Sequence, residues 1–188
     1  MDKEKIYNIL MSDNIVQSIN NNLDYLFNII PELKYMVGFE HKHPHHHLDV
    51  WNHTLYALSL SVKDFEVRMS LLLHDIGKPF SFVEGEVRHF PNHPYVSMQM
   101  AYVILKRLEF NDQEICKLCY LINMHDTPIK DEEILCNEDL MKKRFLVQVC
   151  DAFAHNPNKL AKRKAYLQST YEKFKNKNNE ILELINRF

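Results

Sequence analysis

The adjacent pair His74-Asp75 is the first place where the sequence suggests chemistry. It ends an apolar segment, MSLLLHDIGK, and is followed closely by Gly77. Burying an imidazole and a carboxylate behind three leucines costs free energy unless something compensates them. A divalent cation would do so, because it keeps the imidazole neutral and the carboxylate ionised. The alternative is a salt-bridged polar pair at a helix end, and the dipeptide by itself favours that alternative.

Histidine is abundant in this chain and glycine is scarce. The sequence holds 11 histidines, most of them between His41 and His125, and 3 glycines. So few glycines leave almost nothing for phosphate-cradling loops, which excludes a P-loop enzyme or a dinucleotide-binding fold. The function is therefore expected to depend on histidine.

Two further residues complete a pattern around the pair. His53 lies in DVWNHT and Asp151 in FLVQVCDAFAH. The set His53, His74-Asp75 and Asp151 resembles the metal-binding signature of the HD-domain phosphohydrolase superfamily. Three longer segments resemble consecutive stretches of the HD domain of bacterial CCA-adding tRNA nucleotidyltransferases: IIPELKYMVGFEHKHPHHHLDVWNHT, SLLLHDIGKP and VRHFPNHPYVS. Agreement of several motifs in order is more specific than any one of them.

The resemblance implies a metal-dependent phosphohydrolase. Two imidazoles and two carboxylates suit Mn, Fe, Co, Ni or Zn. Such a metal activates water and neutralises phosphoryl charge, so the expected reaction is cleavage of a phosphate mono- or diester of a nucleotide or RNA end. The alternative is a non-catalytic nucleotide- or RNA-binding module that keeps the fold and the metal. Because every expected ligand is present, the enzyme is favoured.

His93 and His125 form a second layer of the resemblance. They occupy positions that carry further metal ligands in binuclear members of the superfamily. If both bind a second ion, Asp75 would bridge the two. The alternative is that both contact substrate phosphate. Whether the site holds one metal ion or two therefore stays open.

Other residues are expected to assist. Lys78 resembles the lysine of the HD-x-G-K signature and would place an ammonium near the phosphate. The residues expected to carry catalysis are Asp75, Lys78, His93 and His125. Arg144 is expected to bind substrate, because it shares a helical face with Asp151.

The tract HKHPHHH and the residues beside it suggest supporting roles. The tract is expected to be a polar loop in which His46 or His47 approaches the active-site mouth, and His47 is taken as a substrate-binding residue. Asp49, four residues before His53, would either cap a helix or orient that histidine. Of these two roles, the cap is slightly favoured.

Apolar positions recur mostly at helical spacing, which predicts an all-α, HD-domain helical bundle. Helices are expected from the following segments: 6–10, 15–27, 50–62, 67–75, 94–108, 112–124, 138–155, 158–175 and 181–185. Residues 80–90 are expected to form a turn or short hairpin. We expect one HD domain over 1–188, with its core at about 31–155 and the terminal helices, 1–30 and 158–188, packed on it.

The charge balance argues against a strongly charged partner. Formal net charge is −2, from 23 basic and 25 acidic residues, so no global field favours nucleic acid or a membrane. From Lys159 to Lys177 seven residues are basic and one is acidic, and a solvated outer helix explains this better than an RNA surface. The expected partner is a small phosphorylated substrate, a nucleotide, with RNA less supported. The oligomeric state stays open.

The sequence also raises expectations about where the protein is located in the cell and which branch of the family it resembles. No apolar run is long enough to span a bilayer, MDKEKIYNIL lacks a signal-peptide cleavage site, and there are four cysteines, so a cytoplasmic protein is expected. Only about fifty residues precede His53, without the glycine-rich, paired-aspartate motif of a nucleotidyltransferase head. A free-standing HD domain is therefore expected.

Overall fold

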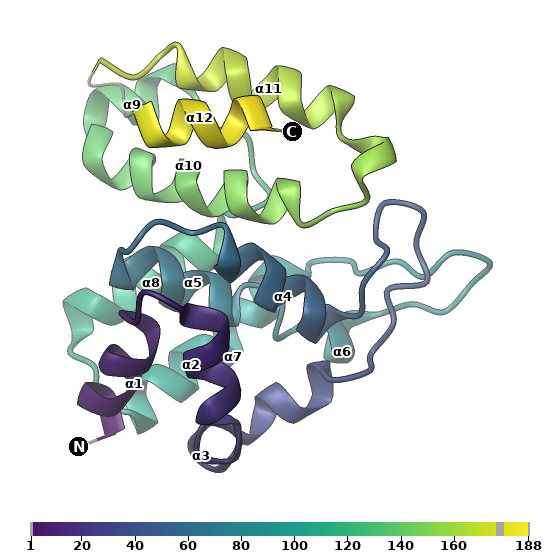
Figure 1. Cartoon of the computed structure of the whole chain (residues 1–188), viewed down its shortest axis with the longest axis vertical. Coiled ribbons are helices and arrows are strands. Elements are labelled where there is room, and N and C mark those ends of the chain that lie inside the picture. Colours follow the sequence, from purple (N-terminus) through teal and green to yellow (C-terminus); the bar gives the residue numbers. More distant parts are fainter. Residues whose placement is uncertain (1, 176–178, 188) are drawn as a thin grey trace.

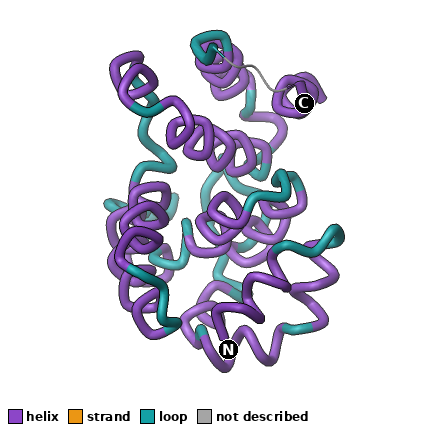
Figure 2. Tube along the Cα trace, turned by 90° about the vertical axis from the view of Figure 1, so that its left-hand side faces the viewer, coloured by secondary structure: helices purple, strands orange, loops and turns teal. Residues whose placement is uncertain are grey.

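The computed structural model describes residues 2–175 and 179–187, and within them the chain is helical without a β-sheet (Figures 1 and 2). The α-helices are α1 (Asp2–Leu10), α2 (Ile15–Asn21), α3 (Leu23–Ile29), α4 (Val50–Ser59), α5 (Phe65–Leu73), α6 (Lys78–Ser81), α7 (His93–Arg107), α8 (Asp112–Asn123), α9 (Asp131–Cys136), α10 (Glu138–Phe153), α11 (Ala161–Tyr171) and α12 (Asn179–Arg187). Two 3-10 helices are η1 (Pro31–Met36) and η2 (Pro157–Lys159). The all-α prediction is confirmed.

Helix α5 lies at the centre of the bundle. All residues from Val67 to Leu73 are buried, and the helix packs against α4, α8 and α10. A helix that is buried on every side belongs inside the fold rather than on its surface. Asp64 fixes where it begins, because its side chain accepts a hydrogen bond from the Val67 N–H. The other end of this central helix carries His74 and Asp75.

Other polar caps fix where the neighbouring helices begin. Asn137 caps α10, and Asn111 forms a reciprocal capping box with Glu114 at α8. At α4, Asp49 Oδ1 accepts a hydrogen bond of 2.6 Å from the Asn52 N–H. The favoured role of Asp49, a helix cap, is confirmed.

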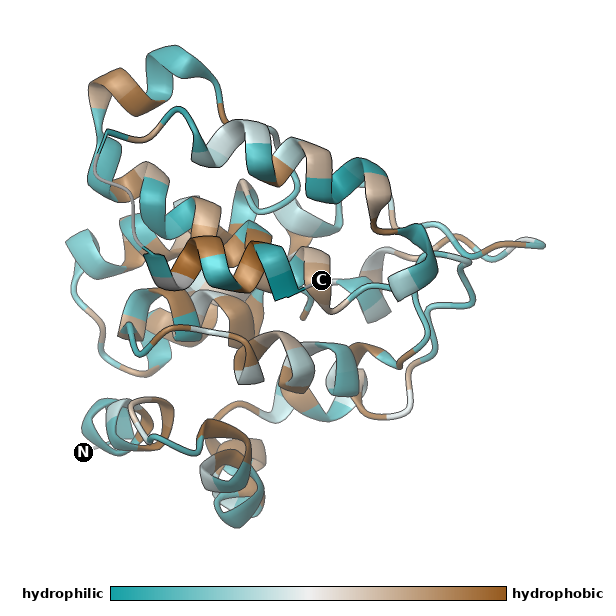
Figure 3. Cartoon of the chain, turned by 45° about the horizontal axis from the view of Figure 1, so that its top comes forward, coloured by the Kyte–Doolittle hydropathy of each residue, from teal (hydrophilic) through white to brown (hydrophobic). Residues whose placement is uncertain are grey.

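The helices lie on two sides of α4 and α5. Helices α9 to α12 lie above this pair in Figure 1, and α1 to α3 lie below it. Figure 3 shows hydrophobic residues gathered mainly on the surfaces that the helices turn toward one another. The last helix follows this rule, since Ile181, Leu184 and Ile185 are buried. Burial of these apolar faces is the main force that holds the layers together.

The structure differs from the expected helices in three places. The segment 15–27 is divided at Asn22, whose side-chain amide donates to the Ser18 carbonyl and so competes with the helix. Helices α6 and α9 were not expected, because four and six residues are too few to show a helical period. Between Val83 and His89 a single antiparallel bridge forms, so the hairpin expected in 80–90 is confirmed.

The basic segment and the expected domain both extend beyond the residues that the structure describes. The basic segment ends at residue 177, and its residues 176 and 177 lie outside the described part, as do the first and last residues of the expected domain. Across residues 2–175 and 179–187, no helix combines the length and the apolar character needed to cross a membrane. The domain division itself stays a prediction.

Candidate metal centre

A tight turn after α5 holds the His-Asp pair in place. His74 is the C-terminal cap of the helix, and the Lys78 N–H donates to the Asp75 carbonyl at 3.0 Å. Gly77 approaches α7 so closely that a Cβ on it would lie 2.5 Å from the Ser97 backbone nitrogen. Its own N–H donates to Ser97 Oγ at 2.9 Å. Only glycine fits here, and the turn is anchored to α7 as a result.

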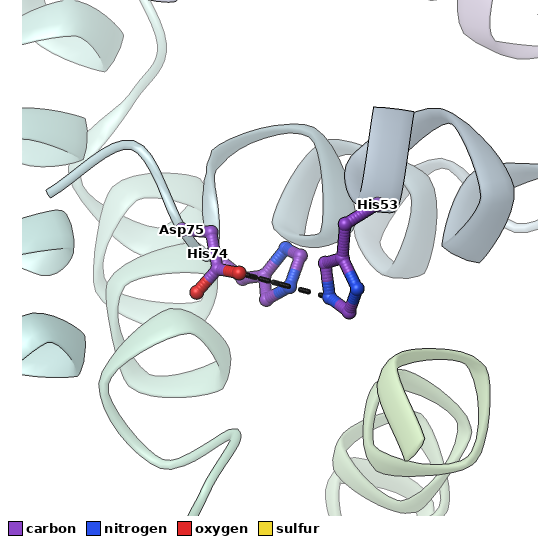
Figure 4. Close-up of side chains that lie close together, drawn as sticks. All are labelled: His53, His74 and Asp75. Atoms are coloured by element: carbon purple, nitrogen blue, oxygen red, sulfur yellow. Dashed lines mark ion pairs between the residues drawn. The ribbon is translucent and has the colours of Figure 1, made fainter. Parts of the chain in front are cut away.

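The four residues expected to hold one metal are brought together from three parts of the chain. His53 Nε2 lies 2.9 Å from Asp151 Oδ1 and 3.7 Å from Asp75 Oδ2. His74 Nε2 lies 3.3 Å from Asp75 Oδ2 and 3.5 Å from Asp151 Oδ1. Figure 4 shows the side chains of His53, His74 and Asp75 directed toward one another. All four residues are buried.

Backbone carbonyls fix how the two imidazoles are turned. His53 Nδ1 lies 3.1 Å from the Ala154 carbonyl, and His74 Nδ1 lies 2.7 Å from the Leu71 carbonyl. Since a carbonyl only accepts, Nδ1 carries the hydrogen in each ring. Each Nε2 therefore faces the carboxylates. A protonated ring donates a hydrogen bond to them from Nε2, whereas a neutral ring presents a lone pair there, as a metal-binding histidine does.

His93 and His125 repeat this arrangement on the other side of Asp75. Their Nδ1 atoms donate to the carbonyls of Phe90 and Ile122, at 3.1 and 2.7 Å. Their Nε2 atoms lie 3.3 Å apart, and 3.4 and 3.9 Å from Asp75 Oδ1. One oxygen of Asp75 thus faces His53 and His74, while the other faces His93 and His125. The two oxygens of Asp75 therefore face two different pairs of imidazoles.

The ligand set fits a divalent cation. His74 Nε2 and Asp75 Oδ1 are buried without a hydrogen-bond partner, and such atoms are costly to leave unsatisfied. Imidazole nitrogens and carboxylate oxygens this close together need a positive charge between them, which either a proton on the imidazole or a bound cation supplies. Three groups of ligand atoms lie within 4.8 Å of one another and could hold a metal ion: His53, His74 and Asp75; His53, Asp151 and His155; and Asp75, His93 and His125.

The two carboxylates favour positive charge at this point. Burial opposes ionisation, yet the pKa of Asp75 is held well below its usual value by His74 and Lys78, and that of Asp151 chiefly by His155. Burial alone would lower the pKa of His74, but the charges of Asp75 and Asp151 raise it to about 9. The buried carboxylates therefore stabilise positive charge in the cluster, either as a proton on His74 or as a bound cation that replaces it.

Lys78 lies within the site and is held from two sides. Its Nζ is 2.7 Å from Asp75 Oδ2 and 3.1 Å from His41 Nε2. His41 is turned by its own Nδ1, which donates to the Leu48 carbonyl at 2.9 Å, and His46 stacks on it at 3.7 Å between ring centres. Nothing in the sequence separates His41 from the other histidines of its tract. Only the fold shows that it contacts the lysine.

A cavity of about 230 Å3 opens beside the cluster. It is lined by His43, His46, Lys78, Arg88, His89, Phe90, His93, His125, Asp126, Asp151, His155 and Arg163. Three of these side chains are cationic, which suits an anionic ligand. Asp126, whose Oδ2 lies 3.3 Å from His93 Nε2, was not predicted. A signal was present, because His125-Asp126 repeats the His-Asp dipeptide.

Arg144 lies away from this cavity, contrary to the expectation that it clamps phosphate. Its guanidinium is fully buried and donates to the carbonyls of Met124 and Thr127 and to Glu133 Oε1, the last at 2.9 Å. Arg144 does lie on the Asp151 side of α10, but seven residues of helix place it about 10 Å further along the axis. It holds the loop that carries His125.

His47 is also placed apart from the cluster, contrary to its expected contact with substrate. It is exposed and lines a separate surface hollow together with Asp49 and Asn52. His43 and His46 are the members of the tract that line the cavity, and His46 contacts His155 with 4.3 Å between ring centres. The loop conformation, which the sequence did not reveal, decides between these neighbours.

Comparison with known proteins identifies the family. Residues 45–167 match the HD domain, which is more than half of the chain. The chain belongs to the HD-domain family. HD domains are typically metal-dependent hydrolases, and the His/Asp clusters described above agree with the divalent metals that they bind.

Two curated relatives are similar to this HD-domain protein over part of their length. A CC-adding tRNA nucleotidyltransferase of Thermus thermophilus is 29% identical over 140 residues, which is 66% of this chain and 32% of the relative. An A-adding tRNA nucleotidyltransferase of Deinococcus radiodurans is 27% identical over 110 residues, which is 54% of this chain and 25% of the relative. The chain thus spans a third or less of these relatives, and the likeness to CCA-type enzymes is confirmed.

Proposed function

We propose that this HD domain is a phosphohydrolase that cleaves a phosphate mono- or diester of a nucleotide or RNA end. The observation that carries the proposal is the convergence of four imidazole Nε2 atoms on the two oxygens of Asp75 and on Asp151, next to a cavity with cationic walls. A cluster that attracts cations and a cavity that attracts anions together suit a phosphate ester.

The proposed ligands of the catalytic ion are His53, His74, Asp75 and Asp151. A divalent metal bound there lowers the pKa of a coordinated water and neutralises charge on the phosphoryl group. His93 and His125 either complete a second ion site through Asp75 or contact the phosphate directly. The geometry is compatible with both roles, and metal stoichiometry separates them.

The cationic side chains of the cavity are proposed to bind the phosphate. Lys78 stays ion-paired with Asp75 at 2.7 Å and also lines the cavity, so its ammonium can offset the charge of a phosphoryl oxygen. Arg163 lines the same cavity and lies 3.8 Å from Asp151 Oδ2. These groups orient the ester and stabilise charge that develops on its oxygens.

A second candidate is a nucleotide- or RNA-binding module without turnover. It is favoured by the names of the relatives, both tRNA nucleotidyltransferases, whose HD regions need not hydrolyse anything. A module of that kind has no need for a complete set of ligands beside a phosphate-sized cavity. The intact cluster is why hydrolysis is proposed first.

The deciding experiment is turnover by metal-stripped protein resupplied with Mn, Fe, Co, Ni, Zn or Mg. The panel holds nucleoside monophosphates, 2′,3′-cyclic nucleotides, short RNA with a 3′-phosphate and a generic diester, with Asp75→Asn alongside. Asp112→Asn, on the exposed start of α8, is the matched control. Turnover that needs a metal and is lost in Asp75→Asn only would establish the hydrolase. Metal binding and RNA binding without any turnover would establish the module instead.

A further inference from the structure

We propose that a second cavity, adjoining the first, binds the nucleoside of the substrate through its aromatic base and with little selectivity among bases. This inference rests on the proposed phosphohydrolase function and adds where the organic part of the ester lies. It concerns the cavity between α10, α11 and the loop 125–129, which we call the side pocket. Its lining residues are His125, Asp126, Pro128, Gln148, Asp151, Ala152, Lys162, Arg163, Tyr166 and Leu167.

The side pocket opens onto the phosphate cavity. It has a volume of about 290 Å3, and four of its residues also line the cavity beside the metal cluster: His125, Asp126, Asp151 and Arg163. Because the two spaces share this boundary, one ligand can extend across both. A phosphate at the cluster would then carry its leaving group into the side pocket.

The wall away from the cluster is apolar. It consists of Pro128, Ala152, Leu167 and the ring of Tyr166. Ala152 and Leu167 are fixed in the packed interior, since 5% and 1% of their surface is exposed. Apolar and aromatic walls with few polar groups are typical of sites for planar organic ligands. Such a wall favours a base over a bare sugar.

The polar groups of the wall already have partners. The Tyr166 hydroxyl donates to Gln148 Oε1 at 2.9 Å and accepts from the Ile129 N–H at 3.0 Å. Gln148 Nε2 donates to the Thr127 carbonyl at 2.6 Å. These bonds hold the Tyr166 ring in place and leave its hydroxyl and the Gln148 amide committed to the protein. Tyr166 and Gln148 can therefore contact the face of a base without recognising its edges, as in other sequence-tolerant stacking sites.

Positively charged side chains at the entrance of the side pocket argue against a purely apolar ligand. Lys162 is exposed at its rim, and Arg163 lies on the boundary with the phosphate cavity. Positive charge beside an apolar wall suits a ligand that joins an aromatic ring to an anion. A nucleotide has this construction, whereas an apolar peptide segment does not.

The test compares adenosine and uridine monophosphates with ribose 5-phosphate, which lacks the base. In wild type, kcat/KM for both nucleotides should exceed that for ribose 5-phosphate by about tenfold or more, the scale of one stacked base. Tyr166→Ala should reduce this preference about tenfold. Tyr166→Phe keeps the ring and should keep the preference, even if both rates fall. Tyr102→Ala, on the half-exposed surface of α7, is the matched control.

Three results would overturn the side pocket while leaving the hydrolase intact. These are equal turnover of nucleotide and ribose 5-phosphate by wild type, a proportional loss on both in Tyr166→Ala, and a preference of more than about a hundredfold for one base, beyond what stacking supplies.

Photolabelling with azidoadenosine monophosphate separates the two proposals and needs no variant to fold. Label in residues 125–129 or α11 without turnover would support the pocket and refute the hydrolase. Label that is confined to other peptides would overturn the pocket whether or not the protein hydrolyses esters.

Discussion

The histidines of the helical core and those of the loop 41–47 have the same side chain but are held differently. In the core, His53, His74, His93 and His125 each donate from Nδ1 to a backbone carbonyl. In the loop, His43 Nδ1 instead accepts from a backbone N–H and its ring stacks on a neighbouring histidine. The difference teaches that density of histidine does not make a ligand. What distinguishes the core rings is that a carbonyl holds each one with its Nε2 facing a carboxylate.

His41 belongs to the histidine-rich loop by sequence, but its ring is held in the same way as those of the core histidines. It begins the histidine-rich tract, yet its Nδ1 donates to the Leu48 carbonyl as a core histidine would. Its Nε2 contacts Lys78 instead of a carboxylate. Among the loop histidines, His41 therefore contacts a charged residue of the site, whereas His43 and His46 line the cavity beside it.

The largest expected effect comes from removing a core histidine. His53→Gln should lower metal-dependent turnover by about 10³-fold or more, because the metal supplies several kcal/mol of charge stabilisation. It should also abolish the rise in melting temperature on adding metal, since only the folded state binds the ion. Kinetics and thermal melts with and without metal check this. His45→Gln is the matched loop variant, and an equal loss in both would break the comparison.

The next effect concerns the support of a core histidine. Arg144→Met should destabilise the fold by about 3 kcal/mol, because the buried arginine anchors the 124–128 carbonyls and pairs with Glu133 at 2.9 Å. Denaturant unfolding measures the change. Arg107→Met removes an exposed pair with Glu32 and should cost less than about 1 kcal/mol. Similar costs for the two would show that the loop does not depend on Arg144.

A smaller effect is expected at His41, the loop histidine that contacts Lys78. His41→Phe keeps the ring but removes the acceptor that holds Lys78, and kcat should fall about tenfold, the scale of other outer-shell partners. KM and metal affinity should change much less. A decrease in metal affinity equal to that of a ligand variant would instead place His41 among the ligands.

The smallest effect is expected from the exposed part of the loop. Replacing His45 and His47 with Asn should keep turnover within about twofold, as for surface changes away from a site. Weakly bound metal should decrease, because exposed imidazoles bind transition metals without a formed site. Metal analysis after gel filtration checks this. Loss of a tightly bound metal ion in this variant would contradict the proposal that the core histidines, and not the exposed loop, hold the metal.

Local pattern predicted most of the fold. Apolar spacing of three and four residues requires amphipathic helices, and side-chain caps such as Asp49 and Asp64 fix where they begin. The expectation that His53, His74-Asp75 and Asp151 share one site came from their resemblance to the HD-domain signature, since the cost of burying the His74-Asp75 pair by itself left a salt bridge as the favoured interpretation. The elements missed were α6 and α9, which are too short to show a period.

Only the tertiary structure decided which nearby residues share that site. Arg144 and Asp151 have compatible helical spacing, but the loop 124–128 covers one and the cavity opens at the other. His46 and His47 are adjacent in sequence, and the path of an irregular loop alone directs one inward. Sequence determines residue type and local period, whereas the partners of a side chain depend on how distant segments pack, which no local pattern encodes.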